Sequence, residues 1–256
     1  SVAQLEADPN VESVADINSI PGIIFNKKVG VFTDQRMRQA VSAALNLEEM
    51  MHAAYGSDEF YTMNHELMLD EQTAWYTDAG KDQYNQQDLK KAKALLDEAG
   101  YDGETVRIMT SREYDDYYMY SVVMQEQLKE IGMNVELEVY EWATVIEKQS
   151  DPSAYDMTLT GWGIRPTPIQ YPFLDSRAEW AGWSNSQDID GYIDAIQASS
   201  SQEEAKEIMA DLQEEFWNYL PIVKIGNKMD ITSIRTEVEG YDTLVGPILW
   251  NIHVQE

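Results

Sequence analysis

The residues best suited to contacting another molecule lie in the stretch AYDMTLTGWGIRPTP, residues 154–168. Gly161 and Gly163 lack a Cβ and allow close approach to the backbone, and the prolines that follow restrict the loop. Trp162 offers a flat apolar face with one indole donor, and Arg165 offers a cation that pairs with carboxylates. This combination is typical of a cleft edge, although a tryptophan at a strand end can equally be a core residue.

Residue patterns for catalysis and for metal or nucleotide binding are missing from the rest of the chain. There is no cysteine, and the three histidines, His52, His65 and His253, stand apart from one another and from carboxylates at metal-ligand spacing. The glycines around Trp162 match neither of the two common phosphate-binding patterns, and no GxSxG motif is present. We therefore expect no metal, no cofactor and no catalytic residue.

Paired carboxylates leave one enzymatic alternative open. Asp115-Asp116 and Glu203-Glu204 could serve a carbohydrate-active hydrolase that uses two acids and aromatic platforms, but acidic helix starts explain both pairs. Aromatic residues in predicted loops favour a binding site over an active site. These residues are Tyr61, Trp75, Tyr76, Tyr114, Tyr117, Trp142, Trp162, Tyr171, Trp180 and Trp183.

The overall charge restricts the possible partners. The 256 residues include 46 acids and 18 bases, for a net charge of −28, which disfavours nucleic acid and anionic membranes. The hydrophobic share of 43% indicates a folded protein. No apolar run of about 18 residues suggests a transmembrane segment. The chain opens on a polar segment without methionine, so we expect a processed product or an excised fragment.

Hydrophobic periodicity and capping residues predict alternating helices and strands. We expect a strand or strand pair over 16–25 and a long loop over 57–87, with two helices between them. A further strand over 155–160 should end abruptly at Gly161. Strand, helix and strand over 105–139 indicate an α/β layer with some parallel pairing. The expected helices are 34–45, 46–56, 88–100, 115–132, 141–149, 188–198 and 201–219, and the further expected strands are 222–225, 229–234 and 249–254.

Two arginines stand at the start of the first predicted helix, which Asp34 should cap. The helix dipole disfavours cations there, so Arg36 and Arg38 need carboxylate or carbonyl partners. We expect a structural salt bridge for Arg38 rather than contact with a ligand.

Four stretches, taken in order along the chain, resemble a known family. They are FTDQRMRQAV continued by ALNLEEM (residues 32–50), LKKAKALLDEAGYD (89–102), MQEQLKEIGMNVELEVYEW (124–142) and YDMTLTGW (155–162). Their order and spacing are similar to those of the peptide- and nickel-type extracellular solute-binding proteins that serve ABC importers. Such proteins have two α/β lobes, and their chains are roughly twice as long as this one.

The resemblance implies a C-terminal fragment of such a protein. Its fold class would be α/β, a periplasmic-binding-protein-like lobe with a mixed sheet flanked by helices. Residues 1–25 would be a remnant of the first lobe with a crossing strand, 26–240 the second lobe, and 241–256 the segment that returns to the first lobe. The edge facing the first lobe should expose apolar residues.

The resemblance also implies a function. The whole protein would be a monomeric, extracytoplasmic receptor, anchored at the cell surface or periplasmic, that delivers a peptide or other small solute to an ABC permease. The ligand-binding residues would be Gly161, Trp162, Gly163, Arg165 and Thr167. In peptide-binding members an aspartate near the position of Arg165 pairs with the peptide ammonium, so an arginine here should favour a carboxylate or phosphate.

Overall fold

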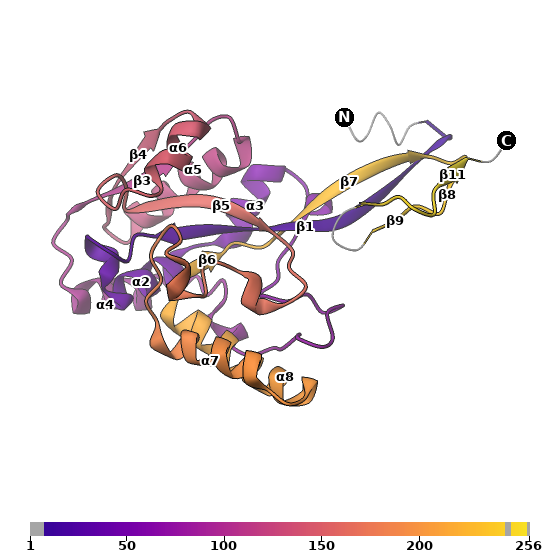
Figure 1. Cartoon of the computed structure of the whole chain (residues 1–256). Helices are drawn as coiled ribbons and strands as arrows, with labels where there is room; N and C mark the ends of the chain where they lie inside the picture. The colour runs from indigo at the N-terminus through magenta and orange to yellow at the C-terminus, as the bar shows by residue number, and fades with distance from the viewer. Residues whose placement is uncertain (1–7, 244–246, 255–256) are drawn as a thin grey trace.

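The computed structural model describes residues 8–243 and 247–254, so parts of both predicted end segments, 1–7, 244–246 and 255–256, lie outside the described residues. One main sheet has the strand order β2-β7-β1-β5-β3-β4, with β6 also paired to β1 (Figure 1). Its strands are β1 (Val11–Phe25), β2 (Tyr61–Thr62), β3 (Thr105–Thr110), β4 (Asn134–Val139), β5 (Met157–Gly163), β6 (Ile222–Lys224) and β7 (Asn227–Arg235).

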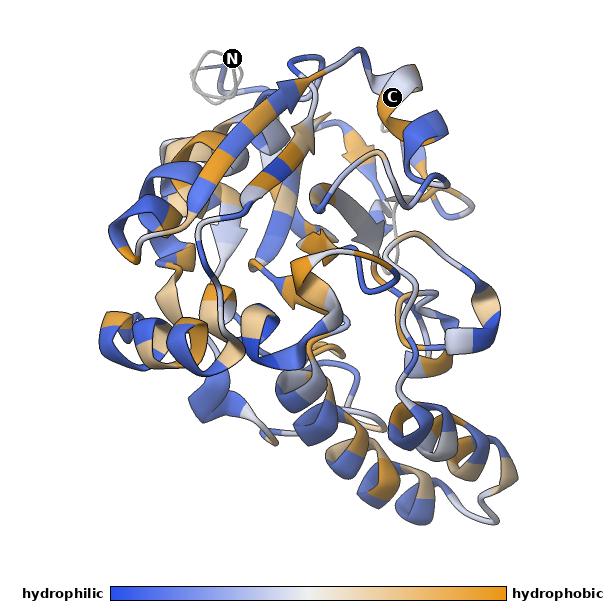
Figure 2. Cartoon of the chain, turned by 90° about the vertical axis from the view of Figure 1, so that its left-hand side faces the viewer, coloured by the Kyte–Doolittle hydropathy of each residue, from blue (hydrophilic) through white to orange (hydrophobic). Residues whose placement is uncertain are grey.

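Helices flank this sheet, and the sheet is mixed. Strand β3 is parallel to β4 and β5, whereas β1 is antiparallel to β5, β6 and β7, which confirms the predicted fold class and the strand–helix–strand unit. Figure 2 shows hydrophilic and hydrophobic residues interleaved along helices and strands, as expected of elements with one buried face. The helices are α2 (Gln35–Ala44), α3 (Leu47–Tyr55), α4 (Leu89–Ala99), α5 (Asp115–Glu130), α6 (Trp142–Lys148), α7 (Gln187–Ala198) and α8 (Gln202–Tyr219).

Helix ends follow the capping residues visible in the sequence. Side chains of Asp34, Asn46 and Asp88 accept backbone hydrogen bonds at the starts of α2, α3 and α4. Left-handed Gly56 and Gly100 end α3 and α4. Between α3 and α4 the chain forms only β2 and short turns of 3-10 helix, in line with the predicted long loop. None of the described helices is both long and apolar enough to cross a membrane.

Strand β1 is longer than predicted and is not divided at Pro21-Gly22. It pairs with β7 up to Ser19 and with β6 from Gly22, so Pro21 falls in the gap between the two partners. The carbonyl of Pro21 accepts from the backbone N–H of Ile225 on that side, where the missing N–H of proline would also point. The Ile225 carbonyl, which an N–H at position 21 would face, accepts instead from the Tyr84 hydroxyl at 2.8 Å, so the strand continues past the proline.

Strand β5 also differs from the prediction. The sequence suggested that the strand ends before Gly161, but β5 runs through Gly161, Trp162 and Gly163. The antiparallel partner β1 extends far enough to pair Ile20 with Trp162 and Ser19 with Gly163. Backbone pairing with a long neighbour outweighs the low strand propensity of two glycines.

The outer part of β1 leaves the lobe with β7 as a long two-stranded ribbon (Figure 1). Pairing there runs from Val11 opposite Arg235 to Ile17 opposite Met229, and both ends of the described chain lie near the far end of the ribbon. Two small strand pairs follow β7 in the chain: β8 (Val238–Glu239) with β11 (His253–Val254), and β9 (Asp242–Thr243) with β10 (Pro247–Ile248).

Candidate ligand-binding site

Three aromatic rings meet where β3, β4 and β5 end, and we call Tyr114, Tyr117 and Trp142 the aromatic patch. The centroid of the Tyr114 ring lies 5.3 Å from that of Tyr117 and 4.7 Å from that of Trp142, and the Tyr117 and Trp142 centroids are 5.6 Å apart. Tyr114 is 44% exposed. The patch therefore offers stacking and edge surfaces to a ligand at the sheet edge.

The parallel order of the strands explains why these rings meet. Because β3, β4 and β5 run the same way, their carboxyl ends share one edge, which is where ligands bind in α/β sheets. Helix α5 begins just after β3 and α6 begins just after β4, so their first turns place Tyr114, Tyr117 and Trp142 at that edge. Gly161 lies beside them: a Cβ at this position would be 3.0 Å from the Tyr117 hydroxyl.

The carboxylate of Asp116 lies next to the aromatic patch and ends a series of hydrogen bonds between tyrosine hydroxyls. The Tyr120 hydroxyl donates to that of Tyr55 at 2.9 Å, and Tyr55 donates to Asp116 at 3.1 Å. Lys228 on β7 approaches the same carboxylate at 3.6 Å. Burial and the neighbouring Asp116 raise the pKa of Tyr117 to about 12, so its hydroxyl stays protonated and able to donate at neutral pH.

Arg112 is an exposed residue at this edge that the sequence analysis did not single out. It follows β3 directly, and its guanidinium donates to the Tyr118 hydroxyl at 2.9 Å and lies over the Tyr118 ring at 4.7 Å. The sequence could have pointed to Arg112, because it lies in the loop after the first strand of a strand–helix–strand unit. Loops in that position line the sheet edge at which ligands bind.

Trp162 points to the opposite face of the sheet from the patch. Successive side chains of a strand alternate between faces, and Gly161 faces Tyr117, so Trp162 faces the other way. It is 5% exposed, with ring centroids 4.8 Å from Phe173 and 5.4 Å from Trp180. Its indole Nε1 has no hydrogen-bond partner in the described part of the chain. This placement suits core packing, and ligand contact by Trp162 stays a prediction.

The other predicted site residues lie at the end of β5 and in the loop after it. Gly163 is exposed, and Arg165 is exposed with its backbone held by Gln72, which donates to its carbonyl at 2.8 Å. Thr167 is half-buried, and no partner for its hydroxyl is found among the described residues. The structure thus leaves the Arg165 side chain exposed just after β5, whereas the Trp162 side chain is buried.

Asp34 and Arg38 have structural positions. Asp34 caps α2 and pairs with Arg36 at 2.5 Å. Arg38 is 2% exposed and donates to the backbone carbonyls of Tyr219, at 2.8 and 3.1 Å, and of Phe32, at 2.9 Å. Its partners are therefore carbonyls rather than the carboxylate of a salt bridge.

Neither carboxylate pair has the arrangement of two facing acids. Both lie in the first turns of helices, Asp115-Asp116 in α5 and Glu203-Glu204 in α8. Asp116 is occupied by Tyr55 and Lys228, and Glu204 accepts from the backbone and hydroxyl of Ser200. The geometry gives no support to the hydrolase alternative.

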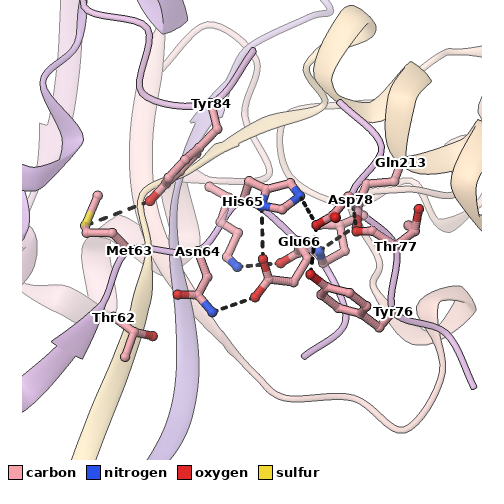
Figure 3. A network of polar contacts seen from close by, with 12 residues as sticks. Thr62, Met63, Asn64, His65, Glu66, Tyr76, Thr77, Asp78, Tyr84 and Gln213 are labelled. Atoms are coloured by element: carbon pink, nitrogen blue, oxygen red, sulfur yellow. Dashed lines mark hydrogen bonds and ion pairs between the residues drawn. The ribbon is translucent and has the colours of Figure 1, made fainter. Parts of the chain in front are cut away.

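A second group of polar residues holds the long loop against α8 and β6 (Figure 3). The carboxylate of Glu66 accepts from Asn64 at 2.6 Å and lies 3.2 Å from His65 Nδ1. The Nζ of Lys224 is fully buried and donates to the Glu66 backbone carbonyl. Gln213 on α8 donates to the carbonyls of Thr77 and Ala79. These bonds are internal to the lobe, and we regard the group as structural.

The Glu66 group predicts a pH dependence of stability. Burial alone would raise the pKa of Glu66, but the bond from His65 and the charge of Lys224 outweigh it and lower the pKa from 4.5 to about 2. Because the folded value is below the unfolded one, the stabilisation is complete above pH 4.5 and is lost as the pH falls towards 2. It amounts to at most about 3 kcal/mol.

Glu66→Gln should remove this contribution. Urea unfolding of the protein between pH 6 and pH 2.5 should show a smaller loss of stability for Glu66→Gln than for the parent, whereas the exposed Glu203→Gln should follow the parent. Parallel curves for all three proteins would contradict the assignment.

Within residues 8–243 and 247–254, no three His, Cys, Asp or Glu side chains gather as a metal site would require. His65 lines the cavity of about 370 Å³ beside Glu66, and its ring nitrogens lie 3.2 Å from the Glu66 carboxylate and 4.0 Å from that of Asp78 (Figure 3). His253 lies on the surface, 3.0 Å from Glu239. The expectation that the histidines hold no metal stays a prediction.

Sequence similarity relates this chain to known bacterial binding proteins. A model described as "Bacterial extracellular solute-binding proteins, family 5 Middle" matches residues 1–185. A probable peptide ABC transporter periplasmic-binding protein of Sinorhizobium fredii is 24% identical over 97% of this chain. The oligopeptide-binding protein AppA of Bacillus subtilis is 28% identical over 77% of it. These matches cover 49% and 40% of the two relatives.

The solved structure of the oligopeptide-binding protein AppA from Bacillus subtilis in complex with a nonapeptide has the same fold. It superimposes with a TM-score of 0.81 at 21% identity, covering all of this chain and 54% of that one. The chain thus spans about half the length of the relatives that it matches.

Proposed function

Because this chain belongs to the bacterial extracellular solute-binding proteins of family 5, we propose that it forms one lobe of the peptide-binding component of an ABC transporter. The observation that carries this proposal is the aromatic patch beside Gly161, at the sheet edge where α/β proteins bind ligands. A second lobe closing over this edge would hold a peptide between two surfaces and perform no reaction on it.

The ribbon of β1 and β7 supports the proposed domain division. Residues 1–25 would carry the crossing from the first lobe, 26–240 the second lobe, and 241–256 the return. Side chains of β1 are half-buried or exposed up to Ser19 and fully buried from Ile20 to Phe25. Beyond the ribbon, Trp250 is 81% exposed, and Leu249 and Val254 are also exposed, as expected of a surface that the first lobe would cover.

The proposal extends to partners and location. Periplasmic binding proteins are found among the relatives, and this agrees with an extracytoplasmic protein, anchored at the cell surface or periplasmic. Its partners would be the ligand and an ABC permease, and the receptor would work as a monomer. The strong negative charge favours neither nucleic acid nor an anionic membrane as a further partner.

The direct test is calorimetric titration of the complete protein with short peptides. We expect binding with a negative heat-capacity change, because aromatic surface becomes buried. If the complete protein bound another small solute but no peptide, the proposed class of ligand would be wrong, whereas the proposed receptor function would stand. Turnover of any ligand during the titration would overturn the proposal.

Arg165 should set the charge preference of the site. If its guanidinium pairs with a peptide carboxylate, amidation of the C-terminus should weaken binding about tenfold, whereas acetylation of the N-terminus should change it by less than about threefold. Arg165→Ala should erase the effect of amidation. The control is Arg177→Ala, because Arg177 is also exposed but already pairs with Asp175 and Asp194. A strong loss on acetylation would contradict this preference.

A further inference from the structure

A second cavity lies at the other end of the β1–β5 pair from the aromatic patch. We call it the Trp183 pocket: it measures about 530 Å³, and its wall includes Lys28, Ile146, Gln149, Glu179, Trp180 and Trp183. In the antiparallel register Ser19 is opposite Gly163 near the patch, whereas Phe25 is opposite Met157 at the far end. Lys28 follows Phe25 closely, and Gln149 is at the end of α6 rather than at its start near the patch.

The pocket wall contains a buried donor without an acceptor. Gln149 is 8% exposed, and its side-chain Nε2 has no hydrogen-bond partner among the described residues. The backbone of Gln149 is satisfied, because its N–H donates to Val145 and its carbonyl accepts from the Tyr155 hydroxyl at 3.2 Å. An unpaired buried amide costs about 1 to 3 kcal/mol, so an acceptor from outside the lobe would be stabilising.

The same wall contains a cation, Lys28, for which the described residues provide no ion pair. The Nζ of Lys28 is 5.4 Å from the centroid of the Trp183 ring. The Trp183 ring is itself stacked on Tyr155, with centroids 6.0 Å apart. In a protein with 46 acids and 18 bases, a lysine held over a ring instead of a carboxylate remains able to pair with an anion.

The loop that carries Trp180 and Trp183 is fixed to the lobe. Gly182 has φ of +87°, and a Cβ there would lie 2.5 Å from Ile24 and 2.8 Å from the Phe25 carbonyl. The N–H of Gly182 donates to the Tyr155 hydroxyl at 3.2 Å, and its carbonyl accepts from Lys27 N at 3.0 Å. The wall is therefore preformed, which lowers the entropic cost of binding.

We propose that the Trp183 pocket binds a small organic monoanion. Its carboxylate would accept from the Gln149 amide and from the Lys28 ammonium. Its apolar part would lie against Ile146, which is 49% exposed, and against Trp180. The carboxylate of Glu179 in the same wall repels a second negative charge, which favours a monoanion over a dianion such as phosphate. This site is separate from the proposed peptide site and does not depend on it.

The test uses N-acetyl-L-leucine, which has one carboxylate and an apolar side chain, and N-acetyl-L-leucinamide, which lacks the charge. Binding to the complete protein is followed through the tryptophan indole and glutamine amide signals in ¹H–¹⁵N spectra. We expect saturable binding of the acid and at least about tenfold weaker binding of the amide. Lys28→Met and Gln149→Glu should each weaken binding of the acid by at least about tenfold, the latter by placing a negative charge in the wall.

The matched control is Lys90→Met: Lys90 is exposed on α4 and is not among the residues that line the pocket, so its loss should leave acid binding unchanged. Equal binding of acid and amide, absence of saturable binding, or acid binding that Lys28→Met leaves intact would each overturn the proposal. A loss caused by Trp142→Ala but not by Lys28→Met would place the anion at the aromatic patch and would also overturn it.

Discussion

Replacing Arg38 with methionine should lower the free energy of unfolding by about 3 to 5 kcal/mol. The guanidinium is buried and donates three hydrogen bonds to the carbonyls of Tyr219 and Phe32, and it lies over the Tyr219 ring at 4.6 Å. Methionine fills much of the volume but leaves both carbonyls without donors, and each buried unpaired carbonyl costs about 1 to 3 kcal/mol.

The position of Arg38 at the end of α8 adds to this loss. Leu220 ends the helix, where the dipole is negative and favours cations. Lys27 reaches the same region and donates to the carbonyls of Phe25 and Pro221, at 3.0 and 2.8 Å. Burial lowers the pKa of Lys27 well below its usual value, so Arg38 is the dependable positive charge here.

Urea unfolding monitored by tryptophan fluorescence measures the effect of Arg38→Met. The control is Arg36→Met, two residues earlier in the same helix. The Arg36 side chain is 46% exposed, and its ion pair with Asp34 stabilises the fold by less than about 1 kcal/mol. A loss for Arg38→Met no larger than that for Arg36→Met would show that the carbonyl contacts contribute little.

Removing one ring of the aromatic patch should strongly weaken the affinity of the complete protein for its peptide. Trp142→Ala should weaken binding by at least about 30-fold, or about 2 kcal/mol, because partly buried aromatic anchors dominate such interfaces. Tyr114→Ala should have a similar effect, since its ring is the most exposed of the three and contacts both of the others.

Calorimetric titration of the complete protein with a peptide that it binds measures these losses of affinity. The matched control is Tyr192→Ala on α7, a partly buried aromatic that packs on the core away from the sheet edge. Melting temperatures of all variants separate lost affinity from lost folding. Unchanged affinity in both Trp142→Ala and Tyr114→Ala would place the ligand away from the patch and remove the observation on which the proposed function rests.

Much of the secondary structure was predictable because its causes are local. The caps Asp34, Asn46 and Asp88 and the left-handed Gly56 and Gly100 act within a turn of the helices that they delimit, so their residue types reveal the boundaries. The end of β5 was not predictable in this way. Gly161 and Gly163 are poor strand residues, and only pairing with the long strand β1 keeps them in the sheet.

The sequence by itself determined an α/β lobe, its helix boundaries and its family, because periodicity, capping and motif order are properties of neighbouring residues. Only the tertiary structure decided which side chains share a surface. Tyr114, Tyr117 and Trp142 come together because parallel strands end at one edge, whereas Trp162, adjacent to Gly161 in the chain, faces the opposite side of the sheet. Alternation along a strand separates neighbours, and strand pairing unites distant residues, so the composition of a site depends on the register of the sheet.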